Sequence, residues 1–298
     1  MLFEDFDAHR NTVRTPDADI SYVDIGDGSP ALFVHGVGTN AHLWRNVISE
    51  LGGEARCLAL DLPLHGHSPV RADGDFSLGA LADVVAKFCD ALDLVDVNLV
   101  AHDTGGAVAQ IFAAHHPDRL RTLTLTNCDT HDNVPPDAFK PTVELARAGM
   151  LAPAAPALLS DLAVARATVF AVGYEDPELP SLETVRMFLE PVLGTPEAAR
   201  HFERCLCALE PSDLLAIEPA LARLEVPTLV VWGTGDEFFD VRWAYWLRDM
   251  IPGATEVVEI EGGKLFFPDE RAAELVPHLR RHWLAGRRHA PAAGAGRA

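Results

Sequence analysis

The sequence predicts an α/β fold in which a mostly parallel central sheet is flanked by helices and carries an inserted helical cap. Short apolar runs alternate with helical patterns along most of the 298 residues, which is typical of β-α-β crossovers. This alternation breaks once, between about residues 133 and 219, where no convincing strand is found. The length suits one large domain with an insertion, and 48% hydrophobic residues supply a sizeable core.

Seven apolar runs are candidate strands. They are rich in Val, Leu and Ile on both faces, as buried parallel strands are. The runs are Ile20–Val23, Ala31–Val34, Arg56–Leu60, Val97–Ala101, Leu123–Thr126, Thr228–Trp232 and Glu256–Ile260. Helical patterns lie near Leu43–Leu51, Leu78–Leu92, Gly105–His116, Val241–Met250 and Glu270–Leu284. Ser77 is expected to cap the second of these helices.

These patterns divide the chain into a core of residues 1–133 and 219–285 and a cap of residues 134–218. The cap stretch is rich in Ala, Leu and Glu and is punctuated by prolines, so we expect helices in it. Residues 286–298 are small, basic and rich in Pro and Gly. We expect this tail to be disordered.

Composition excludes several kinds of partner. A formal net charge of −20 repels nucleic acid and anionic lipid, so we expect neither as a partner. No apolar run reaches the roughly 20 residues of a membrane span, and the N-terminus does not resemble a signal peptide. Five scattered cysteines are typical of reduced thiols in a cytoplasmic protein, and we expect no metal and no cofactor. The sequence leaves a homo-oligomer open.

The strongest chemical signal is Asp103. The strand Val97–Ala101 runs into His102-Asp103-Thr104-Gly105-Gly106 and then into a helical pattern, the context of a nucleophile elbow. Small residues stand two positions either side of Asp103, where strand and helix backbones nearly touch. A carboxylate nucleophile attacks alkyl carbon and forms an ester with the enzyme. The alternative is that Asp103 only caps the helix.

Four motifs resemble the haloalkane dehalogenase and epoxide hydrolase branch of the α/β-hydrolase superfamily. They are His35–Gly36, Leu43–Asn46 (LWRN), Asp61–Ser68 (DLPxxGxS) and His102–Gly106 (HDTGG). The resemblance covers most of the chain except the cap and implies the α/β-hydrolase fold. It also implies that the backbone N–H groups of Val37 and Thr104 form an oxyanion hole, and that Asp236 is the catalytic acid.

The residues that define each activity in this branch are partly missing. Its catalytic base is a histidine in the loop before Glu270–Arg271, and Leu265 occupies that position. Thr104 and Val37 stand where dehalogenases carry side chains that hold halide. Epoxide hydrolases use a pair of cap tyrosines to polarise the epoxide oxygen. The cap contains only Tyr174, which is a candidate substrate-binding residue.

Other groups are candidates to replace the histidine. His131 follows the strand next to the elbow strand and is the first candidate base, with Asp129 as an alternative. The other interpretation of His131 is a surface histidine at the hinge of the cap. Lys264 is either a solvated lysine or a partner for the Asp236 carboxylate. His35 lies beside the site and either takes part in catalysis or braces its loop. The turn Asp61–Ser68 is interpreted as structural.

These observations favour an enzyme that acts on a small, largely apolar substrate bound between core and cap. A hydrolase similar to epoxide hydrolases or dehalogenases, with Asp103 as nucleophile or general acid/base, is the first hypothesis. A cofactor-independent lyase, cyclase or isomerase that uses Asp103 as acid or base is the second. A ligand-binding protein without catalysis is the third.

Overall fold

The computed structural model describes residues 1–70, 73–168 and 170–286. Its centre is an eight-stranded sheet with the strand order β1-β2-β4-β3-β5-β6-β7-β8. β2 is antiparallel to both of its neighbours, and all later pairs are parallel. The strands are β1 (Arg10–Arg14), β2 (Asp19–Ile25), β3 (Pro30–Val34), β4 (Arg56–Leu60), β5 (Val97–Asp103), β6 (Leu120–Cys128), β7 (Thr228–Gly233) and β8 (Ala254–Ile260).

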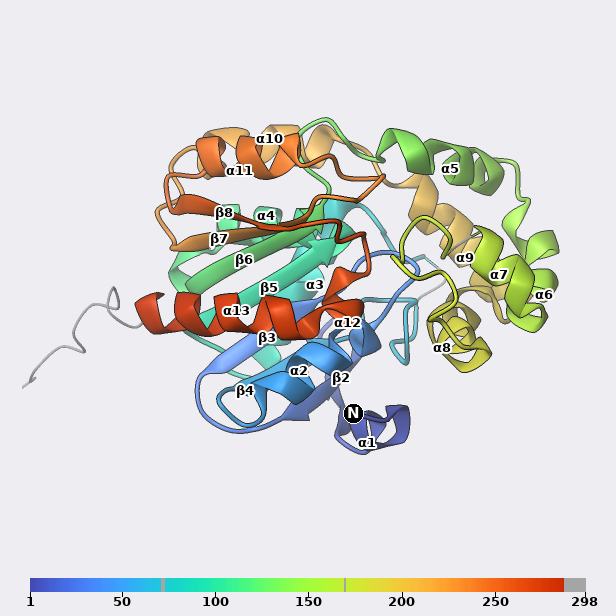
Figure 1. The fold of residues 1–298 in the computed structure, drawn as a ribbon, viewed down its shortest axis with the longest axis horizontal. Helices are drawn as coiled ribbons and strands as arrows, with labels where there is room; N and C mark the ends of the chain where they lie inside the picture. Colours follow the sequence, from blue (N-terminus) through green and yellow to red (C-terminus); the bar gives the residue numbers. More distant parts are fainter. Residues whose placement is uncertain (71–72, 169, 287–298) are drawn as a thin grey trace, which may run out of the picture.

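Helices cover both faces of this sheet, with α2 and α13 on one face and α3 and α4 on the other (Figure 1). The α-helices are α1 (Phe3–Asp7), α2 (Arg45–Leu51), α3 (Leu78–Ala91), α4 (Thr104–His115), α5 (Lys140–Arg147), α6 (Leu151–Ser160), α7 (Leu162–Thr168), α8 (Leu182–Leu193), α9 (Pro196–Cys207), α10 (Ser212–Leu221), α11 (Arg242–Met250), α12 (Phe267–Glu270) and α13 (Ala272–Gly286). Short 3₁₀ helices are Ala41–Trp44, Pro117–Arg119 and Asp137–Phe139. Ser77 caps α3, as expected, by accepting a hydrogen bond from the Ala80 N–H at 3.3 Å.

The seven strands expected from the sequence are β2 to β8, and the α/β fold class is confirmed. β1 was not expected. It is an edge strand whose side chains are exposed or half-buried, so its sequence RNTVR carries no apolar run. Gly286, expected to begin the tail, is the last residue of α13. The rest of the expected tail, residues 287–298, lies outside the described residues.

The insertion between β6 and β7 is helical in its described part. α5 to α9 gather beyond the end of the sheet to which β5 points, and α10 returns to pack against α4 (Figure 1). The boundary expected at residue 218 therefore falls inside α10, which lies on the core. Among the described residues, no helix is long and apolar enough to cross a membrane.

The turn that begins at Asp61 is fixed by a buried carboxylate, in line with a structural role. Asp61 accepts hydrogen bonds from the backbone N–H of Ala41 at 2.9 Å and of His67 at 3.0 Å. The Arg10 guanidinium of β1 donates to the same carboxylate at 2.6 Å. The negative charge is thus paired and hydrogen-bonded, and these contacts hold the pKa of Asp61 below its usual range.

Candidate active site

Asp103 occupies a sharp turn between β5 and α4. Its φ of 55° and ψ of −135° are rare for a residue with a side chain, and such strain is concentrated at functional sites. The turn needs the glycines that follow. A Cβ on Gly105 would lie 2.3 Å from the carbonyl oxygen of His35, and one on Gly106 would lie 2.3 Å from the Cβ of Cys128. The small residues of the elbow pattern therefore permit close contact between backbones.

The loop after β3 contacts the Asp103 side chain. A Cβ on Gly36 would lie only 2.0 Å from Asp103 Oδ2, so the carboxyl group rests directly against this loop. Hydrogen bonds from the backbone N–H groups of Val37 and Thr104 to the Asp103 carboxyl act to lower its pKa. The two donors expected from the sequence thus converge on one carboxyl group.

Burial outweighs these two donors. The Asp103 side chain is exposed only to the cavity described below and not to bulk solvent. This desolvation raises the pKa of its carboxyl group well above the usual value. The negative charges of Asp129 and Asp236 raise the pKa further. A carboxyl group in this setting holds a proton more tightly than it would in water.

Asp129 is the second carboxyl group of the site. Its side chain is 1% exposed, and its Oδ2 accepts a hydrogen bond from the Thr104 hydroxyl at 2.9 Å. Its Oδ1 is buried and accepts no hydrogen bond from the protein. Gln110 fixes the backbone by donating to the Asp129 carbonyl oxygen at 2.8 Å. Burial raises the pKa of Asp129 to about 7.

Asp236 follows β7, and its hydrogen bonds stabilise its own loop. Oδ1 accepts from the backbone N–H of Phe238 at 2.7 Å and of Phe239 at 3.3 Å. Oδ2 accepts from the side-chain amide of Asn127 at 2.7 Å. Burial raises the pKa of Asp236 to about 6, against the effect of these donors. The next two aromatic residues line the cavity, but Asp236 does not.

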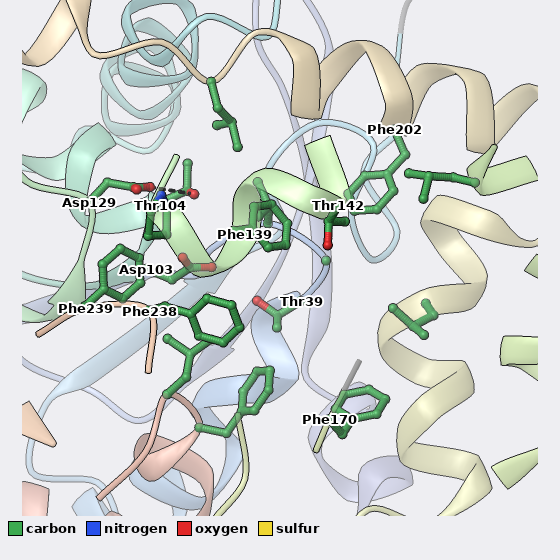
Figure 2. Close-up of a pocket in the computed structure, with 18 of the residues that line it drawn as sticks. Thr39, Asp103, Thr104, Asp129, Phe139, Thr142, Phe170, Phe202, Phe238 and Phe239 are labelled. Carbon is green, nitrogen blue, oxygen red and sulfur yellow. Dashed lines mark hydrogen bonds between the residues drawn. The ribbon is translucent and has the colours of Figure 1, made fainter. Parts of the chain in front are cut away.

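The cavity measures about 140 Å³ and lies between the core and the cap. Figure 2 shows Asp103 and Asp129 on one side of it and Phe170 and Phe202 on the other. Apolar side chains dominate its wall, and six of them are phenylalanines: Phe139, Phe170, Phe202, Phe238, Phe239 and Phe266. A cavity of roughly 150 Å³ with such a lining holds a molecule the size of benzene. The cavity therefore suits a small, mainly apolar ligand.

Basic side chains do not line this cavity in the described part of the chain. Besides the two carboxyl groups, its polar side chains are the hydroxyls of Thr39, Thr104 and Thr142. Leu265 lines the wall where the resembled family places a histidine. No three His, Cys, Asp or Glu residues are grouped as a metal site would require within residues 1–70, 73–168 and 170–286.

His131 does not reach the cavity, so the structure does not support it as the replacement base. Its φ of 56° turns the chain, and its Nδ1 contacts the Glu218 carboxylate of α10. The ring stacks on Trp246 of α11 with 5.0 Å between centroids. Asp129, two residues earlier, faces the cavity instead.

Tyr174 connects the cap to the core and is not among the residues that line the cavity. Its hydroxyl donates to Asp269 Oδ2 at 3.1 Å, and its ring stacks on Phe266 at 4.6 Å between centroids. The backbone N–H of Phe266 donates to the Gly173 carbonyl oxygen at 2.8 Å. This position does not support Tyr174 as a substrate-binding residue of the cavity.

Lys264 and His35 both have structural partners. Lys264 Nζ lies 3.3 Å from Glu237 Oε1, so it pairs with Glu237 and not with Asp236 as the sequence suggested. His35 is fully buried and braces its loop. Its Nδ1 donates to the Gly36 carbonyl oxygen at 2.7 Å, and its Nε2 accepts from the Leu62 N–H at 2.9 Å.

Two residues at the site escaped the sequence reasoning. Asn127 orients Asp236 and, through its Oδ1, accepts from the Gly233 N–H at 2.7 Å. Thr142 of α5 brings the cap's polar side chain to the cavity. The position of Asn127 near the end of β6, beside the elbow strand, could have indicated a role at the site. Nothing in the sequence indicates Thr142, because the packing of the cap helices cannot be predicted from the hydrophobic pattern.

Comparisons with known proteins agree with this geometry. A family model described as "alpha/beta hydrolase fold" matches residues 30–154. A haloalkane dehalogenase of Mesorhizobium japonicum is 39% identical over 115 residues, which are 38% of this chain and 37% of that enzyme. The chain thus spans little more than a third of that relative. An uncharacterised protein of Mycobacterium tuberculosis is 27% identical over 250 residues, covering 82% of this chain and 71% of that protein.

Solved structures extend the likeness to nearly the whole chain. The haloalkane dehalogenase DbeA from Bradyrhizobium elkani superposes with a TM-score of 0.76 over 93% of this chain and 99% of its own, at 21% identity. The chain therefore has the α/β-hydrolase fold, and part of it is homologous to haloalkane dehalogenases.

Proposed function

We propose that this protein is a hydrolase that acts on a small, largely apolar substrate through attack of Asp103 on an alkyl carbon. One observation carries the proposal: the Asp103 carboxyl stands on a strained elbow, in an apolar cavity, between the N–H groups of Val37 and Thr104. A carboxylate placed in this way can form an ester with the substrate. The homology to dehalogenases, enzymes of alkyl carbon, supports the same chemistry.

The two N–H donors act in the second half of such a reaction. When water attacks the ester carbonyl of Asp103, negative charge develops on the carbonyl oxygen. Donors that already point at this oxygen stabilise the charge, and each is typically worth ~10²–10³ in rate. The chain therefore has the two N–H donors that promote hydrolysis of an ester, although Leu265 replaces the histidine.

Haloalkanes fit the cavity poorly as substrates. A leaving halide needs donors, but neither Trp nor Asn lines the cavity within the described residues, and Thr104 and Val37 occupy the positions of the family's halide-holding side chains. We expect little halide release from simple chloroalkanes or bromoalkanes.

A second candidate is a non-hydrolytic acid–base enzyme, such as a cyclase or isomerase. The observation that favours it is the raised pKa of Asp103, because a carboxyl group that holds its proton more tightly than in water can serve as a proton donor. This candidate needs no water and no ester. It predicts that solvent oxygen never enters the product.

Intact-protein mass spectrometry separates the candidates. The wild type and Asp103→Ala are exposed to a panel of small epoxides, and turnover of any reactive epoxide is repeated in ¹⁸O-water. The hydrolase predicts an adduct or a diol that requires Asp103, with an oxygen from Asp103 in the first diol formed. A panel that gives neither an adduct nor a diol would contradict the proposal, and so would full activity of Asp103→Ala.

A further inference from the structure

Thr104 links the two carboxyl groups of the cavity. Its backbone N–H bonds to the Asp103 carboxyl, and its hydroxyl donates to Asp129 Oδ2 at 2.9 Å. Oδ2 is held in this way, and the other oxygen belongs to a residue that lines the cavity. That oxygen, Oδ1, is buried and has no partner in the protein. A buried polar atom without a partner is costly, so its retention beside the elbow needs an explanation.

The pair also lacks a counter-charge. Lys, Arg and His are absent from the described residues that line the cavity, and the wall is mainly apolar. Two carboxyl groups in such surroundings do not both ionise, because each negative charge raises the cost of the other. We therefore expect the pair to hold one proton near neutral pH, either on Asp103 or on Asp129. The form with the proton on Asp129 provides a nucleophile, Asp103, and an acid, Asp129, within the same cavity.

We propose that Asp129 replaces the absent histidine, first as the acid that protonates the leaving oxygen and then as the base that activates water, and that the substrate is consequently an epoxide. This inference rests on the proposed function of Asp103. It deepens that function in two ways. Asp129 becomes both the proton donor and the proton acceptor, and the leaving group becomes an oxygen that needs a proton.

The proton balances over the cycle. In the first half, an Asp103 carboxylate oxygen bonds to an epoxide carbon, the ring C–O bond breaks, and the proton of Asp129 passes to the freed oxygen. The result is a hydroxyalkyl ester on Asp103 and an ionised Asp129. The ester carries no charge, so ionised Asp129 no longer faces a second negative group.

In the second half, Asp129 takes a proton from water while the water oxygen bonds to the ester carbonyl carbon. The acyl C–O bond then breaks, and the remaining hydroxyl proton moves from the carbonyl centre to the departing oxygen. The products are a diol, an ionised Asp103 and a protonated Asp129, which is the starting state. General-base help of this kind is typically worth ~10²–10⁴ in rate.

An alkyl halide cannot complete the same cycle. Halide leaves as a stable anion and takes no proton, so Asp129 stays protonated after Asp103 is alkylated. A protonated carboxyl cannot accept a proton from water, and the ester persists until Asp129 loses its proton to solvent through the closed cavity. The arrangement therefore selects a leaving oxygen over a leaving halide, independently of the missing halide donors.

The test compares two six-carbon probes, 1,2-epoxyhexane and 1-bromohexane, on wild type, Asp129→Asn and Asp132→Asn. Asn keeps an acceptor for the Thr104 hydroxyl but neither gives nor takes a proton. Asp132 is the matched control because it lies on the same loop with a side chain that is 64% exposed. Diol formation and the mass of the intact protein are followed over time, and circular dichroism verifies that each variant is folded.

We expect wild type and Asp132→Asn to form diol from 1,2-epoxyhexane without a lasting adduct. Asp129→Asn should lose turnover by ~10²–10⁴ and, where it reacts, should keep the mass of one epoxide on Asp103. Wild type with 1-bromohexane should give at most a lasting hexyl adduct. Folded Asp129→Asn that makes diol as fast as wild type would overturn the inference, as would steady bromide release by wild type. Both results would leave attack by Asp103 intact.

A failure of the proposed function would look different. In that case neither wild type nor Asp129→Asn would give an adduct or a diol with any epoxide, and Asp103→Ala would behave like wild type. Should Asp129→Asn fail to fold, Thr104→Val provides the second variant. It keeps the backbone N–H at Asp103 but removes the hydroxyl that holds Asp129, so epoxide turnover should fall while the adduct on Asp103 persists. Unchanged turnover in Thr104→Val would count against the inference.

Discussion

Replacing Asp129 with Asn should make stability less dependent on pH while it removes turnover. Burial raises the pKa of Asp129 from 3.8 to about 7. A pKa difference of this size means that, above pH 7, burying the Asp129 carboxylate lowers the free energy of unfolding by roughly 4 kcal/mol. Asn has no charge to bury, so this cost disappears from the variant.

The direction of this pH dependence follows from whether the folded or the unfolded chain holds the Asp129 proton. Below about pH 4 the Asp129 carboxyl is neutral in both the folded and the unfolded chain, and it contributes no pH dependence. Between about pH 4 and 7 the unfolded chain ionises while the folded chain keeps the proton, so wild type loses stability as the pH rises. The free energy of unfolding of Asp129→Asn minus that of wild type should therefore grow by about 2–4 kcal/mol from pH 4.5 to pH 8.

Urea unfolding at pH 4.5, 6 and 8, with linear extrapolation to water, measures this difference directly. Any constant cost of packing an Asn cancels, because only the change with pH is compared. Asp132→Asn is the control, since its exposed carboxylate pays no burial cost, and its curve should run parallel to that of wild type. An Asp129→Asn curve that also runs parallel to wild type would refute the reasoning, because Asp129 would then ionise freely in the folded protein.

Three further outcomes are expected. Arg10→Met leaves the buried Asp61 carboxylate without its cation and should lower the free energy of unfolding by about 3–5 kcal/mol, measured by urea unfolding. Gly36→Ala places a Cβ 2.0 Å from Asp103 Oδ2, which must move away from its N–H donors, so adduct formation should slow by at least ~10² in a mass time course. Adding Leu265→His to Asp129→Asn should shorten the lifetime of the epoxide adduct. An unchanged lifetime would show that an imidazole at this position does not reach the ester.

The sequence predicts the sheet well where burial is strong and poorly where it is weak. β5 and β7 are buried along almost their whole length, so the apolar runs within them mark their positions. β1 fails this criterion because it is an edge strand with exposed side chains, held by pairing with β2. The elbow was predictable for a different reason: the close contacts at Gly105 and Gly106 permit only small residues there.

Side-chain direction in loops could not be predicted. Asp129 and His131 lie two residues apart after the same strand, and the sequence favoured the histidine on chemical grounds. The left-handed backbone at His131 sends its ring to α10 and α11, and Asp129 remains at the cavity. Tyr174 was misplaced for a related reason, because its position depends on how the cap packs against the loop after β8.

The loop after β8 supplies apolar side chains, Leu265 and Phe266, to the cavity wall. Gly173 of the cap lies so close to Phe266 that a Cβ would come within 2.4 Å of its ring, so the cap packs directly against this loop. An imidazolium in this wall would need a carboxylate partner, but Asp236 already accepts hydrogen bonds from Asn127 and from two backbone N–H groups of its own loop. Proton transfer at this site therefore depends on groups on the β5 and β6 side of the cavity, where Asp103 and Asp129 are the titratable side chains that the described residues provide.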